Sequence, residues 1–290
     1  MQHGPAVRRR KLGEELRALR DRSGLTSGDA ARMVGWHQSK ISRIETGRSG
    51  VKPEDVTLLL DLYGDVGPRL RALVHALSVS AAPVGDPAAD RQWWHAYRGL
   101  LPSEYRDFIT LEAAARTART VELSVVPGLL QTPEYAREVT RAALGPSDGS
   151  TVEALVDVRL TRQDVLRTNP PLELSAVIDE AVLRRQIGGP EVMERQLRHL
   201  VDMGRLPHVS LQVLPFSMGG HLGLTGPFVI FSFPDIADLD VVVLDHLTGS
   251  LHLERKEDLD AYGAAFRTIQ ERALSPQESS DLICALADGA

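Results

Sequence analysis

Short helical patterns separated by glycines occupy the first part of this 290-residue chain and restrict its fold more than any other feature. Leu12, Leu16 and Leu19 recur at spacings of four and three, which places them on one face of a helix over residues 7–22. Gly24 ends that pattern, and two more short helical patterns follow it.

The second and third helical patterns meet at a glycine. Thr26 is a good N-cap for the second helix, and Asp29 three positions later completes a capping-box pattern. Ala30 is small enough to let two helices cross closely. Gly35 suits the turn between the helices because glycine tolerates positive φ.

Further helices complete an all-α first domain, for which we expect five helices. The third helix is expected over residues 38–46, with Ile41 and Ile44 facing inward. Pro53 suits the first turn of a fourth helix, and a fifth is expected over residues 68–79.

Charge divides the chain in two. Residues 1–79 carry fourteen Lys and Arg against nine Asp and Glu, a net charge of +5. The whole chain has 33 basic and 39 acidic residues, so residues 80–290 carry a net charge of -11. A basic first domain favours contact with nucleic-acid phosphates, and an acidic remainder does not.

The segment at residues 80–90, SAAPVGDPAAD, has two prolines and no large side chain except Val84. Such a segment buries too little to fold alone, and we interpret it as a linker. The predicted organisation is a DNA-binding domain at residues 1–79, the linker, and a regulatory or partner-binding domain at residues 91–290.

The second domain combines helical patterns with later strand-like runs. Helices are expected over residues 91–100, 103–120, 132–143, 151–167, 190–203 and 257–274. Strands are expected over residues 172–178, 209–214, 228–233, 241–245 and 251–254. Short polar connections between the last of these strands favour antiparallel neighbours. We therefore expect an α+β domain with a mainly antiparallel sheet of about five strands flanked by helices.

The run from Leu16 to Gly50 resembles the helix-turn-helix domains of the Xre and phage-repressor family. The resemblance rests on the Gly24-Leu25-Thr26 entry, the turn glycine and the segment ISRIETG at residues 41–47. It implies a lambda-repressor-like fold in which the helix at residues 38–46 enters the major groove of double-stranded DNA. The family comparison places base contacts at Gln38, Ser39 and Arg43, with Lys40 reaching a base or a phosphate. Phosphate contacts are expected from Ser27, Ser42, Arg48 and Lys52.

These residue types suit base recognition. Gln pairs with adenine and Arg with guanine in bidentate contacts, each worth about 1 to 3 kcal/mol of discrimination. The alternative is that Arg43 pairs with Glu45 or another surface carboxylate and that Gln38 is only a solvated first-turn residue. Trp36 departs from the small aliphatic residue common at its place, and its expected role is packing. His37 replaces the usual Ser or Thr cap, which predicts a weaker cap.

The remainder resembles a group of actinomycete regulators that join an Xre domain to a C-terminal domain of unknown function. The matching segments are LEAAA at 111–115, VPGLLQTPEYAR at 126–137, RLTRQ at 159–163, IDEAVLRR at 178–185, QVLPF at 212–216 and GPF at 226–228. The resemblance implies an antitoxin-like regulator of the Scr type, acting with a small partner protein encoded nearby. A homodimer is expected, because one helix-turn-helix covers only a half-site.

Two other classes of function remain open for the second domain. One is enzymatic, but the sequence has no nucleophile elbow, phosphate-binding glycine loop or HExxH pattern. The other is small-molecule sensing, in which aromatic residues line a cavity gated by the PGLLQTPEY loop. The candidate residues are Trp93, Trp94, Tyr97, Tyr105, Tyr135 and Phe216, although aromatic residues at helical spacing more often form ordinary core.

Composition restricts the setting of the chain. Cys284 is the only cysteine, so neither an intrachain disulfide nor a thiolate cluster for zinc can form. There is no run of 18 apolar residues, and the basic start lacks the apolar core of a signal peptide. We therefore expect a cytoplasmic protein, associated with the nucleoid when bound to DNA, with no membrane contact, no enzymatic activity, no cofactor and no metal.

Overall fold

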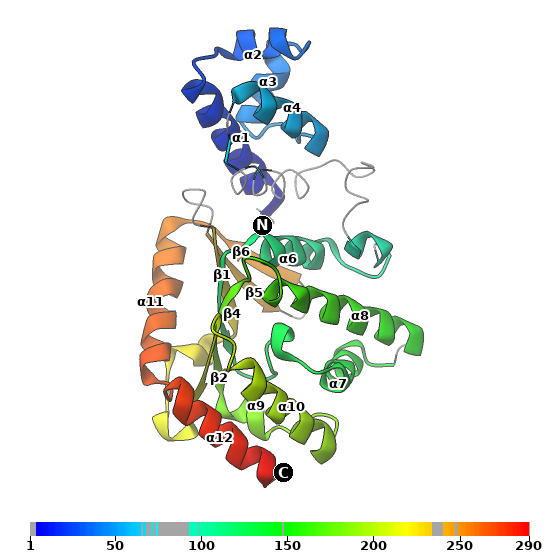
Figure 1. Cartoon of the computed structure of the whole chain (residues 1–290), viewed down its shortest axis with the longest axis vertical. Coiled ribbons are helices and arrows are strands. Elements are labelled where there is room, and N and C mark those ends of the chain that lie inside the picture. The colour runs from blue at the N-terminus through cyan, green and yellow to red at the C-terminus, as the bar shows by residue number, and fades with distance from the viewer. Residues whose placement is uncertain are drawn as a thin grey trace. The chain divides into compact units, whose positions relative to one another are not determined.

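The computed structural model of the chain forms two compact units (Figure 1). It describes residues 4–64, 66–67, 71, 74, 93–97, 99–146, 148–233, 240–246 and 249–289, with side chains except those of 4–10, 95, 96 and 103. The first unit comprises Met1–Arg98, Tyr105–Ala114 and Phe233–Leu239. The second comprises Gly99–Glu104, Ala115–Ser232 and Asp240–Ala290.

The first unit begins with four helices. They are α1 (Gly4–Arg22), α2 (Ser27–Met33), α3 (Gln38–Glu45) and α4 (Pro53–Tyr63). A 3-10 helix (Trp93–Tyr97) lies within the residues predicted to be helical at 91–100. The predicted fifth helix at residues 68–79 lies outside the described residues, apart from 71 and 74, which are helical, and the predicted linker at 80–90 also lies outside them.

The predicted apolar stripes form the core of this helical unit. Leu12, Leu16, Ile41 and Ile44 are almost completely buried, and α1 packs against both α3 and α4. α1 and α3 approach each other closely at Gly13 of α1, where an added Cβ would lie 2.4 Å from the carbonyl oxygen of Ile44. Only glycine allows the two backbones to come this close.

The second unit is built on a six-stranded sheet with the order β3-β2-β1-β4-β5-β6. The strands are β1 (Thr117–Glu122), β2 (Glu173–Asp179), β3 (Val209–Leu214), β4 (Phe228–Ser232), β5 (Val241–His246) and β6 (Gly249–Leu253). β1 pairs in parallel with β2, and β2 with β3, whereas β4, β5 and β6 continue the sheet in antiparallel pairs. The sheet is therefore mixed, and the prediction of a mainly antiparallel sheet of about five strands was wrong.

The parallel half follows from its connections. Parallel neighbours need a crossover, usually helical. Between β1 and β2 the chain forms α7 (Pro133–Leu144) and α8 (Gly149–Arg162), and between β2 and β3 it forms α9 (Glu180–Arg184) and α10 (Pro190–Met203). Of these four helices, α9 was not predicted.

β1 was the main error in the secondary structure predicted from the sequence. Residues 103–120 were predicted as one helix, but α6 (Ser103–Ala114) ends early and β1 starts three residues later. Thr117, Thr120 and Val121 are β-branched, and such side chains favour a strand. The strand that was missed lies between β2 and β4, at the centre of the sheet.

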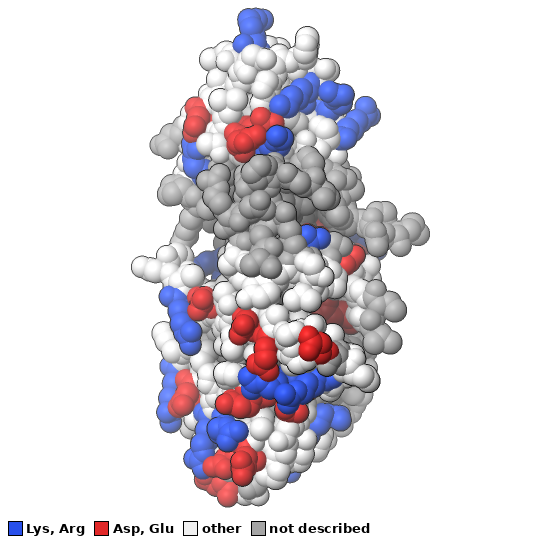
Figure 2. Space-filling model, turned by 90° about the vertical axis from the view of Figure 1, so that its right-hand side faces the viewer, with Lys and Arg blue, Asp and Glu red and all other residues white. Residues whose placement is uncertain are grey.

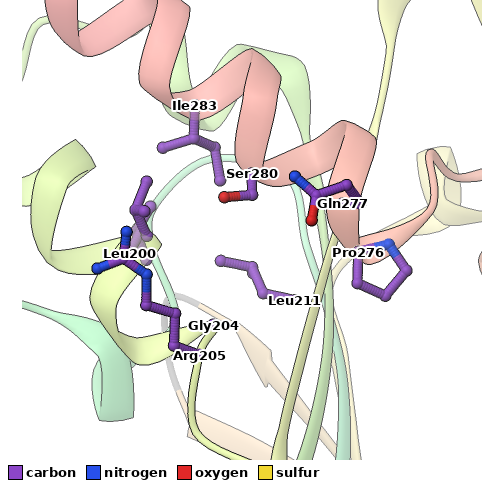
Figure 3. A pocket seen from close by; sticks show the side chains of 9 residues that line it. Leu200, Gly204, Arg205, Leu211, Pro276, Gln277, Ser280 and Ile283 are labelled. Carbon is purple, nitrogen blue, oxygen red and sulfur yellow. The ribbon is translucent and has the colours of Figure 1, made fainter.

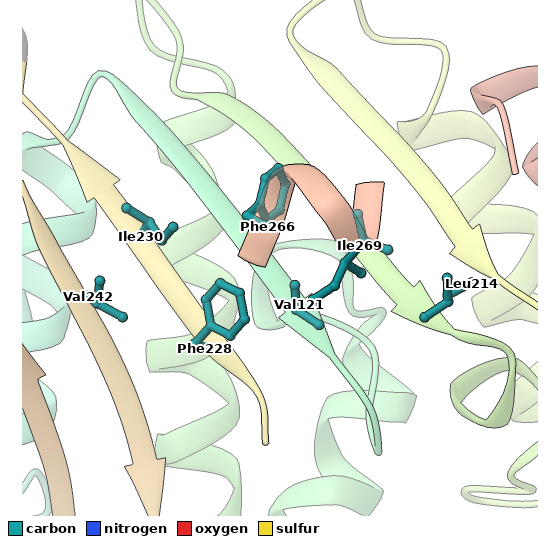
Figure 4. Packing of buried hydrophobic residues seen from close by; sticks show 8 residues of the cluster. Val121, Leu214, Phe228, Ile230, Val242, Phe266 and Ile269 are labelled. Carbon is teal, nitrogen blue, oxygen red and sulfur yellow. The ribbon is translucent and has the colours of Figure 1, made fainter. Parts of the chain in front are cut away.

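Helices cover both faces of the sheet (Figure 1). α11 (Lys256–Arg272) lies on one face, where Phe266 and Ile269 pack over Val121, Phe228 and Ile230 (Figure 4). α7, α8 and α10 lie on the opposite side (Figure 1). A last helix not predicted from the sequence, α12 (Pro276–Asp288), packs beside α10 and β3.

Candidate nucleic-acid interface

The turn between α2 and α3 has the local structure that the sequence predicts. The Thr26 hydroxyl accepts a hydrogen bond from the Asp29 amide at 3.1 Å, and the Asp29 carboxylate accepts one from the Thr26 amide at 3.3 Å. The hydrogen bonds from Thr26 lower the pKa of Asp29. Gly35 has φ +70° and Gly24 has φ +72°, so both occupy the left-handed region that favours glycine. The predicted capping box and glycine turn are confirmed.

A buried ion pair fixes the end of α3 against α1. Arg20 Nε donates to one carboxylate oxygen of Glu45 at 2.7 Å and Arg20 Nη2 donates to the other at 3.1 Å. Both side chains are only 8% exposed, and Arg20 Nη1 also donates to the Leu25 carbonyl at 2.7 Å. A bidentate pair in such a setting sets position as well as supplying energy. The sequence analysis missed this pair, because Arg20 and Glu45 are 25 positions apart and no local pattern links them.

Three of the predicted base-reading residues lie together on the free face of α3. Gln38, Ser39 and Arg43 are exposed, on the side of the helix opposite the buried Ile41 and Ile44. The Arg43 guanidinium makes no hydrogen bond or ion pair with any side chain that the structure describes. The alternative partner, the Glu45 carboxylate, is already occupied by Arg20.

Gln38 also connects the two helices of the motif. Its side-chain amide donates a hydrogen bond to Ser27 Oγ at 3.1 Å, which joins the first residue of α3 to the first residue of α2. This bond orients Gln38 at the exposed N-terminal end of α3. The N-cap of α3 gives less support, since His37 makes no side-chain cap hydrogen bond, as the sequence indicated.

Lys40 has a different environment from the other three residues. Its ammonium group lies 2.9 Å from an Asp55 carboxylate oxygen and 3.4 Å from the centre of the Trp36 ring. Trp36 thus packs beneath a cation, an arrangement that is favourable electrostatically. These contacts hold Lys40 against α4, so a role in reading bases would require it to leave both partners.

The residues predicted to contact phosphates lie in α2, in α3 and in the segment between α3 and α4. Ser42 and Arg48 are exposed, and the Arg48 amide donates to the Arg43 carbonyl at 2.9 Å just after α3. Lys52 precedes α4 and is also exposed, with its ammonium 3.4 Å from Glu54 Oε1. Ser27, at the start of α2, is the hydrogen-bond partner of Gln38. Figure 2 shows one group of Lys and Arg at the right of the helical unit, with Asp and Glu beside it, and basic and acidic residues mixed over the other unit.

The six aromatic residues predicted to line a sensing cavity have several different environments. Trp93 and Trp94 pack edge to face at 5.5 Å, and Tyr105 stacks on Phe108 at 6.3 Å. Tyr97 is half-buried. These four residues belong to the first unit.

Tyr135 and Phe216 belong to the second unit and have opposite environments. Tyr135 is fully buried in α7, where its hydroxyl accepts a hydrogen bond from the Val126 amide at 3.1 Å. Phe216 lies in the turn after β3 and is 55% exposed. One is a packing residue and the other is a surface residue.

The loop predicted to gate that cavity is firmly anchored. Gln196 of α10 is fully buried, accepts a hydrogen bond from the Thr132 amide at 2.7 Å and donates one to the Leu130 carbonyl at 2.7 Å. Gln163 donates to the carbonyls of Gly128 and Gln131. These bonds fix the loop at residues 128 and 130–132, so it is part of the packed structure of the second unit.

Several titratable groups of the second unit lie where the parallel strands β1 and β2 end, because the register pairs Glu122 with Ile178, the residue before Asp179. Glu122 lies at the end of β1, and His221 Nε2 lies 3.5 Å from an Asp179 carboxylate oxygen at the end of β2. Glu180 pairs with Arg184 at 2.6 Å. Among the described residues, no group of three or more His, Cys, Asp or Glu side chains is placed to hold a metal ion. None of the described helices is long and apolar enough to span a lipid bilayer.

Two short helices joined by a glycine turn, with polar side chains on the free face of the second, define a helix-turn-helix domain. Residues 11–74 match the family model of a helix-turn-helix domain, which supports a DNA-binding regulator of transcription. Residues 105–284 match the model described as a domain of unknown function (DUF5753), and the chain belongs to that family. Comparisons with curated proteins and with solved structures found no match.

Proposed function

We propose that this protein is a sequence-specific transcription regulator of the Xre type, which reads the major groove with α3. The observation that carries the proposal is the exposed set Gln38, Ser39 and Arg43 on a helix held in place by the Arg20–Glu45 pair. Gln and Arg are the residue types that make bidentate contacts with adenine and guanine. Ser27, Ser42, Arg48 and Lys52 would position the helix through phosphates.

Lys40 is the fourth proposed base-contacting residue, and its role differs. Its contacts with Asp55 and Trp36 support a positioning role for α3 in the free protein. On DNA, the ammonium group would exchange the Asp55 carboxylate for a phosphate or a base edge. Such an exchange replaces one charged partner by another, so its net energy is small compared with that of a new contact.

We further propose an antitoxin-like mode of regulation that involves no catalysis. The second domain would control operator binding by docking a small partner protein or by setting the arrangement of a homodimer. The net charge of -11 over residues 80–290 supports this division, because an acidic body is repelled by DNA and does not add to the contact. A partner changes DNA affinity only if it binds one dimer arrangement better than the other.

The reading helix is tested by paired substitutions of two exposed arginines. Arg43→Ala should weaken binding to the cognate operator, selected in vitro from random duplexes, by about 1 to 3 kcal/mol and relax one base preference. Arg48→Ala should weaken binding to specific and random duplexes alike and lower the slope of log affinity against log salt by about one. Equal losses on both kinds of duplex for Arg43→Ala would contradict the base-reading role.

The regulatory role is tested by comparing the full chain with residues 1–79, each with and without the small protein encoded nearby. We expect the partner to change the operator affinity of the full chain only, because its receptor is the second domain. A partner effect on both proteins, or on neither, would contradict that role. Sedimentation of the full chain alone tests the homodimer directly.

A further inference from the structure

The pocket between α10, β3 and α12 has a volume of about 420 Å³ in the second unit (Figure 3). Its lining residues Leu200 and Ile283 are almost completely buried, so a partner would meet little of their surface. At the first turn of α4, in contrast, charged side chains are accessible to solvent and contact residues that we propose to bind DNA.

The first turn of α4 carries two acidic residues, and each of them pairs with a lysine. An Asp55 carboxylate oxygen lies 2.9 Å from the Lys40 ammonium, and a Glu54 carboxylate oxygen lies 3.4 Å from the Lys52 ammonium. Both lysines belong to the set of residues that we propose to contact DNA. The two arginines of that set make no ion pair with any carboxylate that the structure describes.

The Lys40–Asp55 pair is held more firmly than the Lys52–Glu54 pair. The Lys40 and Asp55 side chains are 39% and 21% exposed, against 50% and 64% for Lys52 and Glu54. The Lys40 ammonium also lies 3.4 Å from the centre of the Trp36 ring. A cation between a carboxylate and an aromatic face has two favourable partners, and their attraction increases as water is excluded. More exposed pairs contribute little.

A phosphate of DNA can pair with Lys40 only by displacing Asp55. Because Asp55 belongs to the same chain, it competes with the phosphate at a high effective concentration. Displacement would also leave the Asp55 carboxylate close to the phosphate, and like charges repel. Contact between Lys40 and a phosphate therefore adds little to DNA affinity, since it replaces an attraction that the free protein already has.

We propose that Asp55 limits the affinity of the helix-turn-helix domain for DNA by holding Lys40 away from phosphates. On an operator, a base edge placed by α3 can take Lys40 from Asp55. Duplexes of random sequence place no such partner, so Lys40 stays with Asp55 and Trp36 and neutralises no phosphate. Sequence-independent binding depends on phosphate neutralisation, so Asp55 weakens it. Asp55 is thus a positioning residue that acts through Lys40.

A carboxylate in a first helical turn can also act only on its own helix. Acidic residues near a helix N-terminus stabilise that helix through its macrodipole, and Glu54 and Asp55 are both placed for this. Such a role would change the free energy of unfolding and leave the salt dependence of DNA affinity unaltered. The salt dependence is therefore the measurement that separates the two roles.

Asp55→Asn in the full chain tests the proposal on duplexes of random sequence. The released Lys40 should neutralise one more phosphate, so the slope of log affinity against log salt should become steeper by about 0.9. In low salt the affinity should rise about two- to fivefold, as expected from a partly exposed pair. Asp61→Asn is the matched control, because Asp61 lies in the same helix and pairs at 2.7 Å with Arg71, which is outside the proposed interface. It removes the same charge and should leave the slope unchanged.

A second substitution shows whether Asp55 acts through Lys40. In a Lys40→Gln background, Asp55→Asn should no longer steepen the slope, because glutamine has no charge to release. An equal steepening in both backgrounds, or none in either, would overturn the proposal.

The inference rests on the proposed DNA binding, and Arg48→Ala separates the failure of one from the failure of the other. If Arg48→Ala lowers the slope on the same duplexes while Asp55→Asn leaves it unchanged, only the role of Asp55 is wrong. If the natural chain binds no duplex DNA, the proposed function and this inference both fail.

Discussion

Glu122 ends the central strand β1, and burial raises the pKa of its carboxyl to about 8 from an ordinary value of 4.5. Thr120, whose hydroxyl lies 3.3 Å from the carboxylate, and the charge of Arg159 act in the opposite direction. The charge of Asp245 adds to the rise. Burial outweighs the two favourable partners, so ionised Glu122 costs the folded state free energy.

The free energy of unfolding should therefore depend on pH through Glu122. The stabilisation from its protonated form is full below about pH 4.5 and is lost as the pH rises through about 8, because the unfolded chain gives up this proton first. Each unit of pKa difference corresponds to about 1.4 kcal/mol. Glu122→Gln removes this dependence, so urea unfolding should show the variant gaining on the natural chain as the pH rises.

A second carboxyl provides the control. Glu153 is exposed and accepts two hydrogen bonds from Arg137, which lower its pKa. Glu153→Gln should change the pH dependence of the free energy of unfolding only weakly, and in the opposite direction to Glu122→Gln. If the free energy of unfolding changes with pH in the same way in the natural chain and in Glu122→Gln, burial does not raise the pKa of Glu122.

At the scale of elements, the contact between α1 and α3 determines the position of α3. Gly13→Ala would place a methyl group 2.4 Å from the Ile44 carbonyl oxygen and 2.6 Å from that of Glu45. Backbone atoms cannot move aside without distorting α3, so we expect a loss of at least about 1 to 3 kcal/mol in the free energy of unfolding. Thermal and urea unfolding of the full chain measure it.

Gly28 in α2 is the matched control, since an added Cβ there would meet nothing nearer than Thr26 Oγ1 at 3.7 Å. Gly28→Ala should leave stability unchanged or raise it, because alanine is the better helix former. If the two variants are equally stable, α1 and α3 do not approach each other as closely as described.

The helical elements of the first unit were predictable because their signals are local. Thr26, Asp29 and Gly35 specify a cap and a turn within ten positions of one another in the sequence. The exposed set on α3 followed from the same periodicity that buries Ile41 and Ile44. The Arg20–Glu45 pair and the Lys40–Asp55 contact were not predictable, because each depends on how helices meet in space.

The sheet was less predictable for two reasons. Only Ala115 and Arg116 separate α6 from β1, with no glycine or proline to mark the change. The parallel pairing of β1, β2 and β3 joins strands that are far apart in the chain, whereas sequence patterns report only neighbours. Short polar connections did predict the antiparallel succession of the later strands correctly.

At the scale of the whole molecule, charge and predicted linker composition assign DNA binding to one part of the chain. We expect residues 1–79 to fold alone, because α1, α3 and α4 share one apolar core. Circular dichroism of this fragment should show a cooperative helical transition. Limited proteolysis of the full chain should cut first within residues 80–90, and a resistant segment there together with an unfolded fragment would contradict the boundary.

The central position of β1 has a consequence for synthesis. Thr120 of β1 donates a hydrogen bond to the Phe228 carbonyl of β4, 108 positions later in the chain. Since β1 leaves the ribosome long before β4 is synthesised, the edge of β1 that pairs with β4 stays unpaired while most of the second domain is made. The helices at the start of the chain make contacts that are much closer in sequence, so they can fold during that interval. We therefore expect nascent chains to gain a folded helix-turn-helix domain first, and to need chaperone protection at the exposed edge of β1 until translation is nearly finished.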